Sequence, residues 1–370
     1  MSDIDELIEI SRHYGNDTAY VIAGGGNTSF KDDERIWIKA SGIPLAGISE
    51  GGFVCLSRHK LGEMEENTYS EDSVLREEQV KSDMQRAIIS PENLRPSVET
   101  SLHNLIDYAY VVHTHPTIIN AVMCANDAQQ EVEERFGSEA LYVEYTDPGY
   151  ILFKKLQAEI RTYRKRYGSE PKIIFLQNHG IFVGANSPSE VKDIYKSIES
   201  RISEGKDLEL PSGMMEAYQS ELASVVSDHY ASRNLASKAF RSPLYSHFSA
   251  NSDQYLKICR PFTPDIIVYC KSNYLFIEKG GKRKKTGDSL KEFENTNGYF
   301  PKVLVEEEGG LIIIEESELS IRTVLEVFTD MMKISYLSEQ FGGPHFMTGE
   351  QISFIDNWEV ENYRRSVAKG

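Results

Sequence analysis

Two periodicities of apolar residues alternate along the chain and predict a mixed α/β fold. Segments with apolar residues three or four apart begin at a capping residue or end at glycine, which is typical of helices. Short runs rich in aromatic and β-branched residues, bounded by glycine or polar turns, are typical of strands. The predicted helices lie within residues 2–15, 70–90, 97–106, 154–168 and 187–203, and the predicted strands within 20–23, 35–42, 108–115 and, on either side of Asn178-His179-Gly180, 172–184.

The strand, turn, strand and helix that begin at Lys172 align without gaps with a segment that begins at Lys302. In this alignment His179 falls on Gly309, so the later copy keeps the pattern and loses the imidazole. Such a unit is common enough to recur by chance; a true repeat would make the C-terminal domain a degenerate copy of the first fold. We expect a catalytic domain over residues 1–210, a helical linker over 211–254 and a smaller C-terminal α/β domain over 255–370.

Composition narrows the class of protein. The chain has 370 residues, 40% of them hydrophobic, which is enough for a large core and favours two domains. A net charge of −17 argues against nonspecific nucleic-acid binding but allows an anionic substrate in a locally positive pocket. The scattered cysteines (Cys55, Cys124, Cys259 and Cys270) and the lack of a long apolar segment predict a cytoplasmic protein that does not cross a membrane.

Two histidines mark the strand predicted within residues 108–115. Residues i and i+2 of a strand face the same side, so His113 and His115 are expected to point together. His179 follows in a glycine turn that can present a side chain into a cleft. Three neutral imidazoles with an open fourth position are the ligand set of a catalytic zinc. The same H-x-H pattern also fits two hydrogen-bonded core histidines.

Other polar residues accompany the histidines. Glu99, shortly before the histidine strand, is a candidate for proton transfer, although a helix N-terminal acid that offsets the macrodipole has the same position. The turns "GGGNTS" (24–29) and "KASG" (39–42) offer amides and hydroxyls that suit a phosphate, or simply close tight turns. His103, one helical turn after Glu99, is interpreted as a packing or hydrogen-bonding residue rather than a fourth ligand.

Five motifs, taken together and in order, resemble the class II aldolase/adducin family: "GGGNTSF", "IKASGIP", "RPSVETSLH", "VVHTHP" and "LQNHGIFVG". The layout of nearly the whole chain is most similar to the aldolase portion of bifunctional rhamnulose-1-phosphate aldolase/alcohol dehydrogenase proteins. The resemblance implies a three-layer α/β/α sandwich around a mostly antiparallel sheet, assembled as a homotetramer with sites at subunit interfaces. Val98 departs from the pattern, because members of the family often have a small hydroxyl residue there.

The resemblance also implies roles for individual residues. Zn²⁺, or another divalent first-row metal, would be held by His113, His115 and His179, and Glu99 would be the acid/base. The remaining implied residues would bind the phosphate of a small-molecule sugar phosphate: Asn27, Ser41, Gly42 and Ser97. The implied reaction is retro-aldol cleavage of a ketose-1-phosphate, such as rhamnulose or fuculose phosphate, to dihydroxyacetone phosphate and an aldehyde.

Two alternative functions remain open at this point. A ribulose-5-phosphate 4-epimerase uses the same metal and retro-aldol chemistry, but an aspartate at position 99 would have favoured it over an aldolase. A non-catalytic, adducin-like binding module is the other alternative, and the presence of all three histidines with Glu99 argues against it.

Overall fold

The computed structural model describes residues 2–280 and 283–358. These residues form two compact units. Unit 1 comprises residues 2–123 and 128–205, and unit 2 comprises the remaining described residues. Within the described residues, no helix is both long enough and apolar enough to span a bilayer.

Unit 1 is built on an eight-stranded sheet that is antiparallel except between its last two strands. The first hairpin turns at residues 32–34 and pairs Lys31 with Ile36. In sheet order the strands are β4 (Ile88–Ser90), β3 (Phe53–Ser57), β2 (Arg35–Lys39), β1 (Asn27–Lys31), β5 (Tyr110–Thr114), β8 (Gly180–Ala185), β7 (Ile173–Leu176) and β6 (Ala140–Val143).

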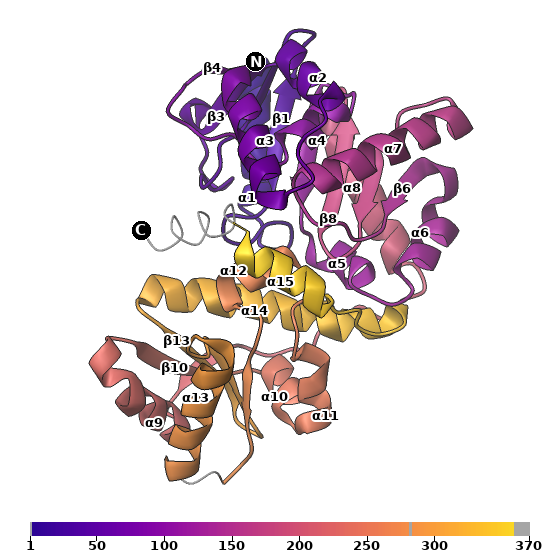
Figure 1. The fold of residues 1–370 in the computed structure, drawn as a ribbon. Coiled ribbons are helices and arrows are strands. Elements are labelled where there is room, and N and C mark those ends of the chain that lie inside the picture. Colours follow the sequence, from indigo (N-terminus) through magenta and orange to yellow (C-terminus); the bar gives the residue numbers. More distant parts are fainter. Residues whose placement is uncertain (1, 281–282, 359–370) are drawn as a thin grey trace. The chain divides into compact units, whose positions relative to one another are not determined.

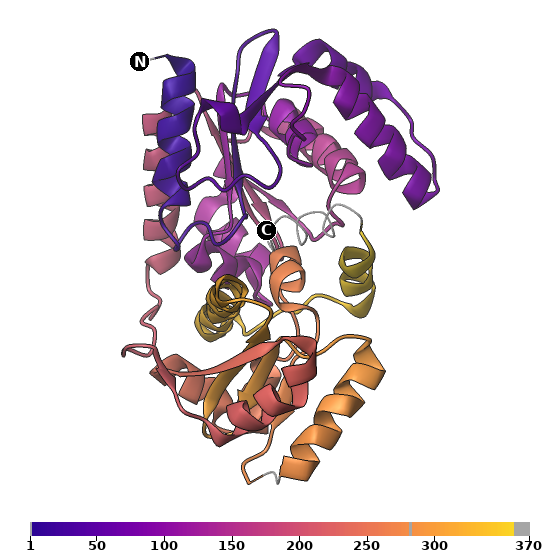
Figure 2. The ribbon, with the colours of Figure 1, turned by 90° about the vertical axis from the view of Figure 1, so that its left-hand side faces the viewer.

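Helices cover both faces of this sheet, which confirms the predicted three-layer sandwich (Figures 1 and 2). One face carries α1 (Asp3–Gly15), α5 (Thr117–Met123), α6 (Ala128–Phe136) and α8 (Pro188–Ser203); the other carries α2 (Arg58–Glu66), α3 (Ser73–Ala87), α4 (Thr100–Leu105) and α7 (Tyr150–Tyr167). Successive strand residues alternate between the layers: Val111 packs in the cluster beneath α4 and α7, whereas the hydroxyl of Thr114 meets Tyr195 of α8. His113 therefore faces the α4 side.

Capping and apolar spacing account for most of the predicted elements. Ser2 forms a capping box with Asp5 at the start of α1, and Ser187 caps α8 just before Pro188, as the sequence indicated. The expected strand over residues 20–23 does not form; its backbone is a turn that bonds to the segment after β5, through Tyr20 O. The apolar pattern of the sequence did not predict β3, β4 or β6.

Unit 2 has a five-stranded sheet with the order β11 (Leu275–Ile277), β12 (Val303–Glu306), β13 (Gly310–Glu315), β10 (Ala236–Arg241) and β9 (Glu216–Tyr218). Its core lies between one face and α9 (Glu221–Tyr230) and α13 (Arg283–Asn297). The other face packs against α10 (Pro243–Ser249) and α14 (Glu318–Ser338). The remaining helices are α11 (Ser252–Tyr255), α12 (Pro264–Cys270) and α15 (Gly349–Asn357).

The sheet of unit 2 repeats five strands of unit 1, and the predicted degenerate repeat is larger than the sequence indicated. The order β11-β12-β13-β10-β9 matches β6-β7-β8-β5-β1, with the first pair parallel and the others antiparallel in both. The gapless alignment places β7, β8 and α8 on β12, β13 and α14. Even the turn is reproduced, since Asn178 and Glu308 both have left-handed φ angles, of 53° and 54°.

Residues 211–254 differ from the expected helical linker. They supply β9, α9, β10 and α10, and β10 is the strand between β9 and β13 in the second sheet. The main segment of unit 2 therefore begins directly after Gly205. The sequence does not predict these strands because β9 is only three residues long and β10 has just two consecutive apolar residues, Ala239 and Phe240, so neither has a long apolar run.

Candidate metal centre

Strand β5 and the turn between β7 and β8 bring three histidines together. His113 lies at the penultimate position of β5, opposite Phe182 of β8, and His115 follows one residue past the end of the strand. His179 lies in the turn that joins β7 to β8, where Asn178 adopts a left-handed conformation. Antiparallel pairing of β5 with β8 therefore places the turn beside the end of the histidine strand, as the metal hypothesis required.

The three imidazoles converge closely enough to share one ion. One ring nitrogen from each histidine lies within 4.8 Å of the others, and no further group of this kind exists among the described residues. The Nε2 atoms of His113 and His115 are 2.9 Å apart. Two nitrogens that each lie 2.0–2.1 Å from a tetrahedral zinc are about 3.3 Å from one another, so the separation of the His113 and His115 nitrogens is close to that of two ligands of one ion.

The tautomer of His113 suits a metal ligand. Its Nδ1 lies 2.9 Å from the carbonyl oxygen of Ile181, an acceptor, so Nδ1 carries the hydrogen and Nε2 presents a lone pair. The ring is fully buried and stacks on Phe182. Burial holds the pKa of His113 well below its ordinary value, so the imidazole stays neutral, as ligation requires.

Glu99 closes the group on one side. It is buried at the N-terminal boundary of α4, and its Oε1 lies 3.4 Å from Nε2 of His113 and 3.5 Å from Nε2 of His179. Burial would raise the pKa of this carboxyl, but His113, His179 and the amide of Asn27 outweigh it and lower the pKa to about 2. The carboxylate is therefore ionised at neutral pH.

A buried oxygen without a donor indicates that the residues fit a cation. Among the described residues, Oε1 of Glu99 has no hydrogen-bond partner, whereas Oε2 accepts from Nδ2 of Asn27 at 2.5 Å. An unsatisfied buried polar atom costs about 1–3 kcal/mol, and more when it is charged. A divalent cation among the three imidazoles would offset that cost, and three neutral nitrogen donors suit zinc or another first-row metal.

Two glycines allow the backbone to approach the histidines. A Cβ at Gly180 would lie 2.5 Å from Thr114 O and 2.7 Å from Cδ2 of His115. Gly26 has a φ of +66°, and its Cβ would lie 2.8 Å from His113 O. Glycine is therefore required at these positions of "NHG" and "GGGN" because a larger residue would collide with the strand that carries the histidines.

The residues expected to bind phosphate gather near Glu99. Ser97 is buried and its Oγ accepts the backbone N–H of Glu99. Ser41 and Gly42 lie beside the segment before Ser97, because Ser41 N donates to Arg95 O and Ala40 bridges to Pro96. Asn27 begins β1 opposite His113. Backbone hydrogen bonds thus bring the segments of Asn27, Ser41 and Ser97 together near the strand ends. The backbone N–H of Ser41 is already used in the bond to Arg95 O.

His103 is a hydrogen-bonding residue and is not a member of the three-histidine group, in agreement with its interpretation from sequence. Sequence reasoning missed two of its partners on β1, Ser29 and Lys31. The available signal was the alternation Asn27, Ser29, Lys31, which places three polar side chains on one face of a buried strand.

The corresponding positions in unit 2 have lost the ligands. By strand register, Ala239 replaces His113, and by alignment Gly309 replaces His179. The space beside Gly309 is filled: Oε2 of Glu306 accepts hydrogen bonds from Tyr218 and Ser220, both at 3.0 Å, and a Cβ at Gly309 would lie 2.7 Å from it. The second copy retains the scaffold with a hydrogen-bonded carboxylate where the first has an imidazole.

Comparison with known proteins gives a family match. The family described as the Class II Aldolase and Adducin N-terminal domain matches residues 5–202, which is more than half of the chain. A protein of Bacillus subtilis (strain 168) named "Uncharacterized oxidoreductase YuxG" is 27% identical over 187 residues, or 48% of this chain. The match spans only 26% of that relative's length.

Two solved structures illustrate the similarity. The N-terminal class II aldolase domain of a conserved protein from Thermoplasma acidophilum is 25% identical, with a TM-score of 0.46, and the match covers 54% of this chain and 92% of that one. The L-fuculose-1-phosphate aldolase from Thermus thermophilus is 13% identical, with a TM-score of 0.35, and the match covers 54% of this chain and 90% of that one.

Proposed function

Because this chain belongs to the class II aldolase/adducin family, we propose that it is a metal-dependent aldolase that cleaves a ketose-1-phosphate to dihydroxyacetone phosphate and an aldehyde. Rhamnulose or fuculose 1-phosphate is the proposed type of substrate. The observation that carries the proposal is the convergence of three imidazole nitrogens within 4.8 Å, with an unpartnered carboxylate oxygen beside them.

His113, His115 and His179 would hold the ion, and we propose that it is Zn²⁺. When bound, the ion would supply Lewis-acid polarisation of the substrate carbonyl. Two features keep His113 in the form that a metal ligand requires: burial keeps its imidazole neutral, and the carbonyl of Ile181 fixes its tautomer. With that chemistry supplied, no lysine Schiff base would be required.

Glu99 would transfer the proton that accompanies bond cleavage. Its Oε1 faces the three-histidine group, and its Oε2 is held by Asn27, so one oxygen is positioned and the other is available to substrate. The carboxylate is ionised, which makes it a base at the start of the reaction. A substrate bound at the histidines would lie within reach of Oε1.

Asn27, Ser41, Gly42 and Ser97 are the proposed phosphate-binding residues. This assignment is supported by the backbone pairing of residues 40–41 with residues 95–96, which lie next to Ser97 and Glu99. We further propose a cytoplasmic homo-oligomer, a tetramer if it follows the family, in which a second subunit contributes to each site. Free cysteines support the compartment.

Product analysis tests the proposal. The purified, zinc-loaded protein is incubated with a panel of ketose-1-phosphates, and dihydroxyacetone phosphate is measured with an NADH-coupled glycerol-phosphate dehydrogenase. We expect release of dihydroxyacetone phosphate from at least one 6-deoxyketose phosphate. Conversion of a pentulose 5-phosphate to its C4 epimer without triose release would instead identify an epimerase. Stoichiometric zinc without turnover of any substrate would favour a binding module.

A further inference from the structure

One face of strand β1 contacts the helix that carries Glu99. Asn27, Ser29 and Lys31 alternate along β1, and all three side chains are buried. Asn27 bonds to Glu99, Ser29 Oγ lies 2.7 Å from Nδ1 of His103, and Lys31 Nζ donates to the carbonyl oxygen of His103 at 2.7 Å. Strand β1 therefore contacts α4 at three points: the side chain of Glu99, the ring of His103 and the backbone carbonyl of His103.

The donor and the acceptor of each side-chain hydrogen bond between Glu99 and Ser29 can be assigned, starting from the bond at Glu99. Nδ2 of Asn27 donates to Oε2 of Glu99, so the Asn27 amide turns its oxygen toward Nε2 of His103. An amide oxygen only accepts, so Nε2 of His103 carries the hydrogen. Nδ1 is then the acceptor, and the hydroxyl of Ser29 donates to it. The three hydrogen bonds thus have the same orientation: Ser29 donates to His103, His103 donates to Asn27, and Asn27 donates to Glu99. Together these three hydrogen bonds form a relay.

We propose that His103 is a positioning residue for the reaction. By donating Nε2–H to Asn27, it fixes the orientation of the Asn27 amide, which in turn holds Oε2 of Glu99 and leaves Oε1 facing the histidines. Without this donor the Asn27 amide can flip, and a flipped amide would set its oxygen against the carboxylate. This inference rests on the proposed function and adds a residue that touches neither the proposed substrate nor the ion.

The neutral state of His103 makes this orientation insensitive to pH. The ring is completely buried, and burial lowers its pKa to about 3 although the nearby Glu99 opposes this. His103 therefore cannot become a cation, with a hydrogen on both nitrogens, in the working range of an enzyme. Nδ1 of His103 therefore remains an acceptor for the Ser29 hydroxyl, and each hydrogen bond of the relay keeps the same donor and acceptor.

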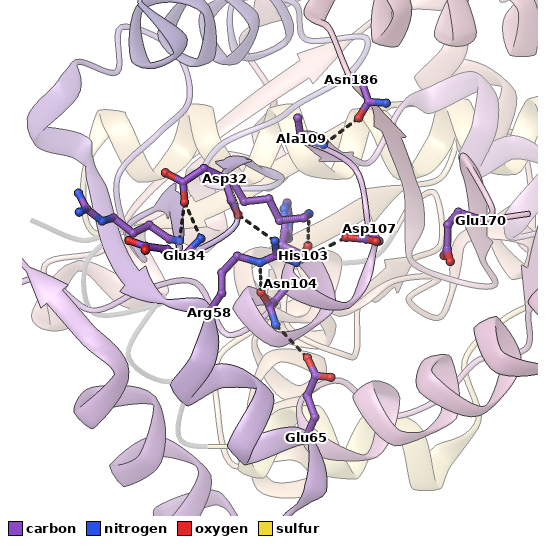
Figure 3. Close-up of polar contacts among 12 residues, drawn as sticks. Asp32, Glu34, Arg58, Glu65, His103, Asn104, Asp107, Ala109, Glu170 and Asn186 are labelled. Carbon is purple, nitrogen blue, oxygen red and sulfur yellow. Dashed lines mark hydrogen bonds and ion pairs between the residues drawn. The ribbon is translucent and has the colours of Figure 1, made fainter.

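Separate contacts hold α4 when the ring of His103 is changed. Lys31 bonds to the backbone of residue 103, which any side chain retains. Asn104 is held at both ends of its amide: its oxygen accepts from Nε of Arg58 at 3.1 Å, and its nitrogen donates to Glu65 at 2.9 Å (Figure 3). Arg58 also contacts Asp32 O and Asp107. Variants at position 103 are thus expected to keep the helix in place.

Paired substitutions test the proposal. His103→Leu removes both nitrogens, whereas His103→Gln supplies an amide that can donate to Asn27 and accept from Ser29. We expect His103→Leu to lower kcat by about 10- to 100-fold with an unchanged zinc content, and His103→Gln to recover most of that loss. Equal losses in both variants, or loss of zinc in both, would show a packing role and overturn the proposal.

A double-mutant cycle tests the route through Asn27. If His103 acts through that amide, adding His103→Leu to Asn27→Ala should not lower kcat further. Losses that simply multiply would contradict the relay.

A measurement on the resting protein separates this inference from the proposed function. In ¹⁵N-histidine NMR spectra of the metal-free protein, assigned with His103→Gln, His103 should be neutral with its hydrogen on Nε2 between pH 5 and pH 8. A hydrogen on Nδ1 would overturn the relay even in an active aldolase. A confirmed Nε2–H tautomer in a protein that cleaves no ketose phosphate would leave the orientation of Glu99 intact and refute the aldolase.

Discussion

Oε1 of Glu99 lies 3.4 Å from Nε2 of His113, and no described residue donates a hydrogen bond to that oxygen. Both residues are buried, one as an anion and the other as a neutral base. An anion and a lone pair that face each other without a shared proton are unfavourable alone and favourable around a cation.

Replacing His179 with alanine should abolish tight metal binding. Loss of an outer-shell partner typically weakens a metal site by 10- to 100-fold, so loss of one ligand of three should weaken zinc binding by at least ~100-fold. The measurement is competition for zinc with a fluorescent chelator. His59→Ala is the matched control, because that side chain is largely exposed on α2 and should leave the affinity unchanged. Full zinc affinity in His179→Ala would exclude this residue as a ligand.

Glu99→Gln should separate catalysis from metal binding. The amide has nearly the shape of the carboxylate but cannot act as a base, and a positioned acid/base contributes about 10²- to 10⁴-fold in rate. We expect kcat for cleavage to fall within that range while zinc content, measured by mass spectrometry, stays at the wild-type level. Retained turnover would remove Glu99 from the proton-transfer step.

Metal analysis of the intact chain should give one ion per polypeptide. Unit 2 repeats the fold, but Ala239 and Gly309 stand at the positions of His113 and His179, and Glu306 fills the space beside Gly309. The described residues hold a single three-histidine group. His179→Ala should therefore bring the zinc content close to zero. A second ion that survives this substitution would place a metal site outside the group.

Zinc should stabilise unit 1 against unfolding. An ion that binds only the native state at 100 times its dissociation constant adds about 2.7 kcal/mol to the free energy of unfolding. Trp37 lies in unit 1, and Trp358→Phe removes the other tryptophan, so fluorescence then reports on unit 1 alone. We expect zinc to raise the urea midpoint in this background, and not when His179→Ala is added.

Acidification should destabilise unit 1 through His103. Burial lowers its pKa from the ordinary 6.5 to about 3, so between these values the unfolded chain binds a proton that the native state excludes. Stability therefore falls as the pH drops below 6.5, by about 2 kcal/mol at pH 5 from this residue alone. In the Trp358→Phe background, His103→Gln should lose less stability between pH 7 and pH 5 than the parent protein. An identical pH dependence in both would mean that His103 is accessible to protons.

Local sequence signals anticipated much of unit 1. Ser2, Ser187 and Pro188 marked helix starts because capping and the φ of proline act within a few residues. The pairing of His113 with His115 on one side followed from strand periodicity. By contrast, β9 and β10 carry no apolar run, and only the partners they pair with make them strands.

The sequence by itself determined which chemical groups are present and how neighbouring ones are oriented, because capping, strand alternation and glycine turns are local. It also determined the gapless repeat of β7, β8 and α8. Only the tertiary structure decided that His179 meets His113 and His115, that Glu99 lies beside them and that His103 holds Asn27. These contacts join residues on separate strands and helices, and their geometry depends on sheet register and buried packing, which no local pattern specifies.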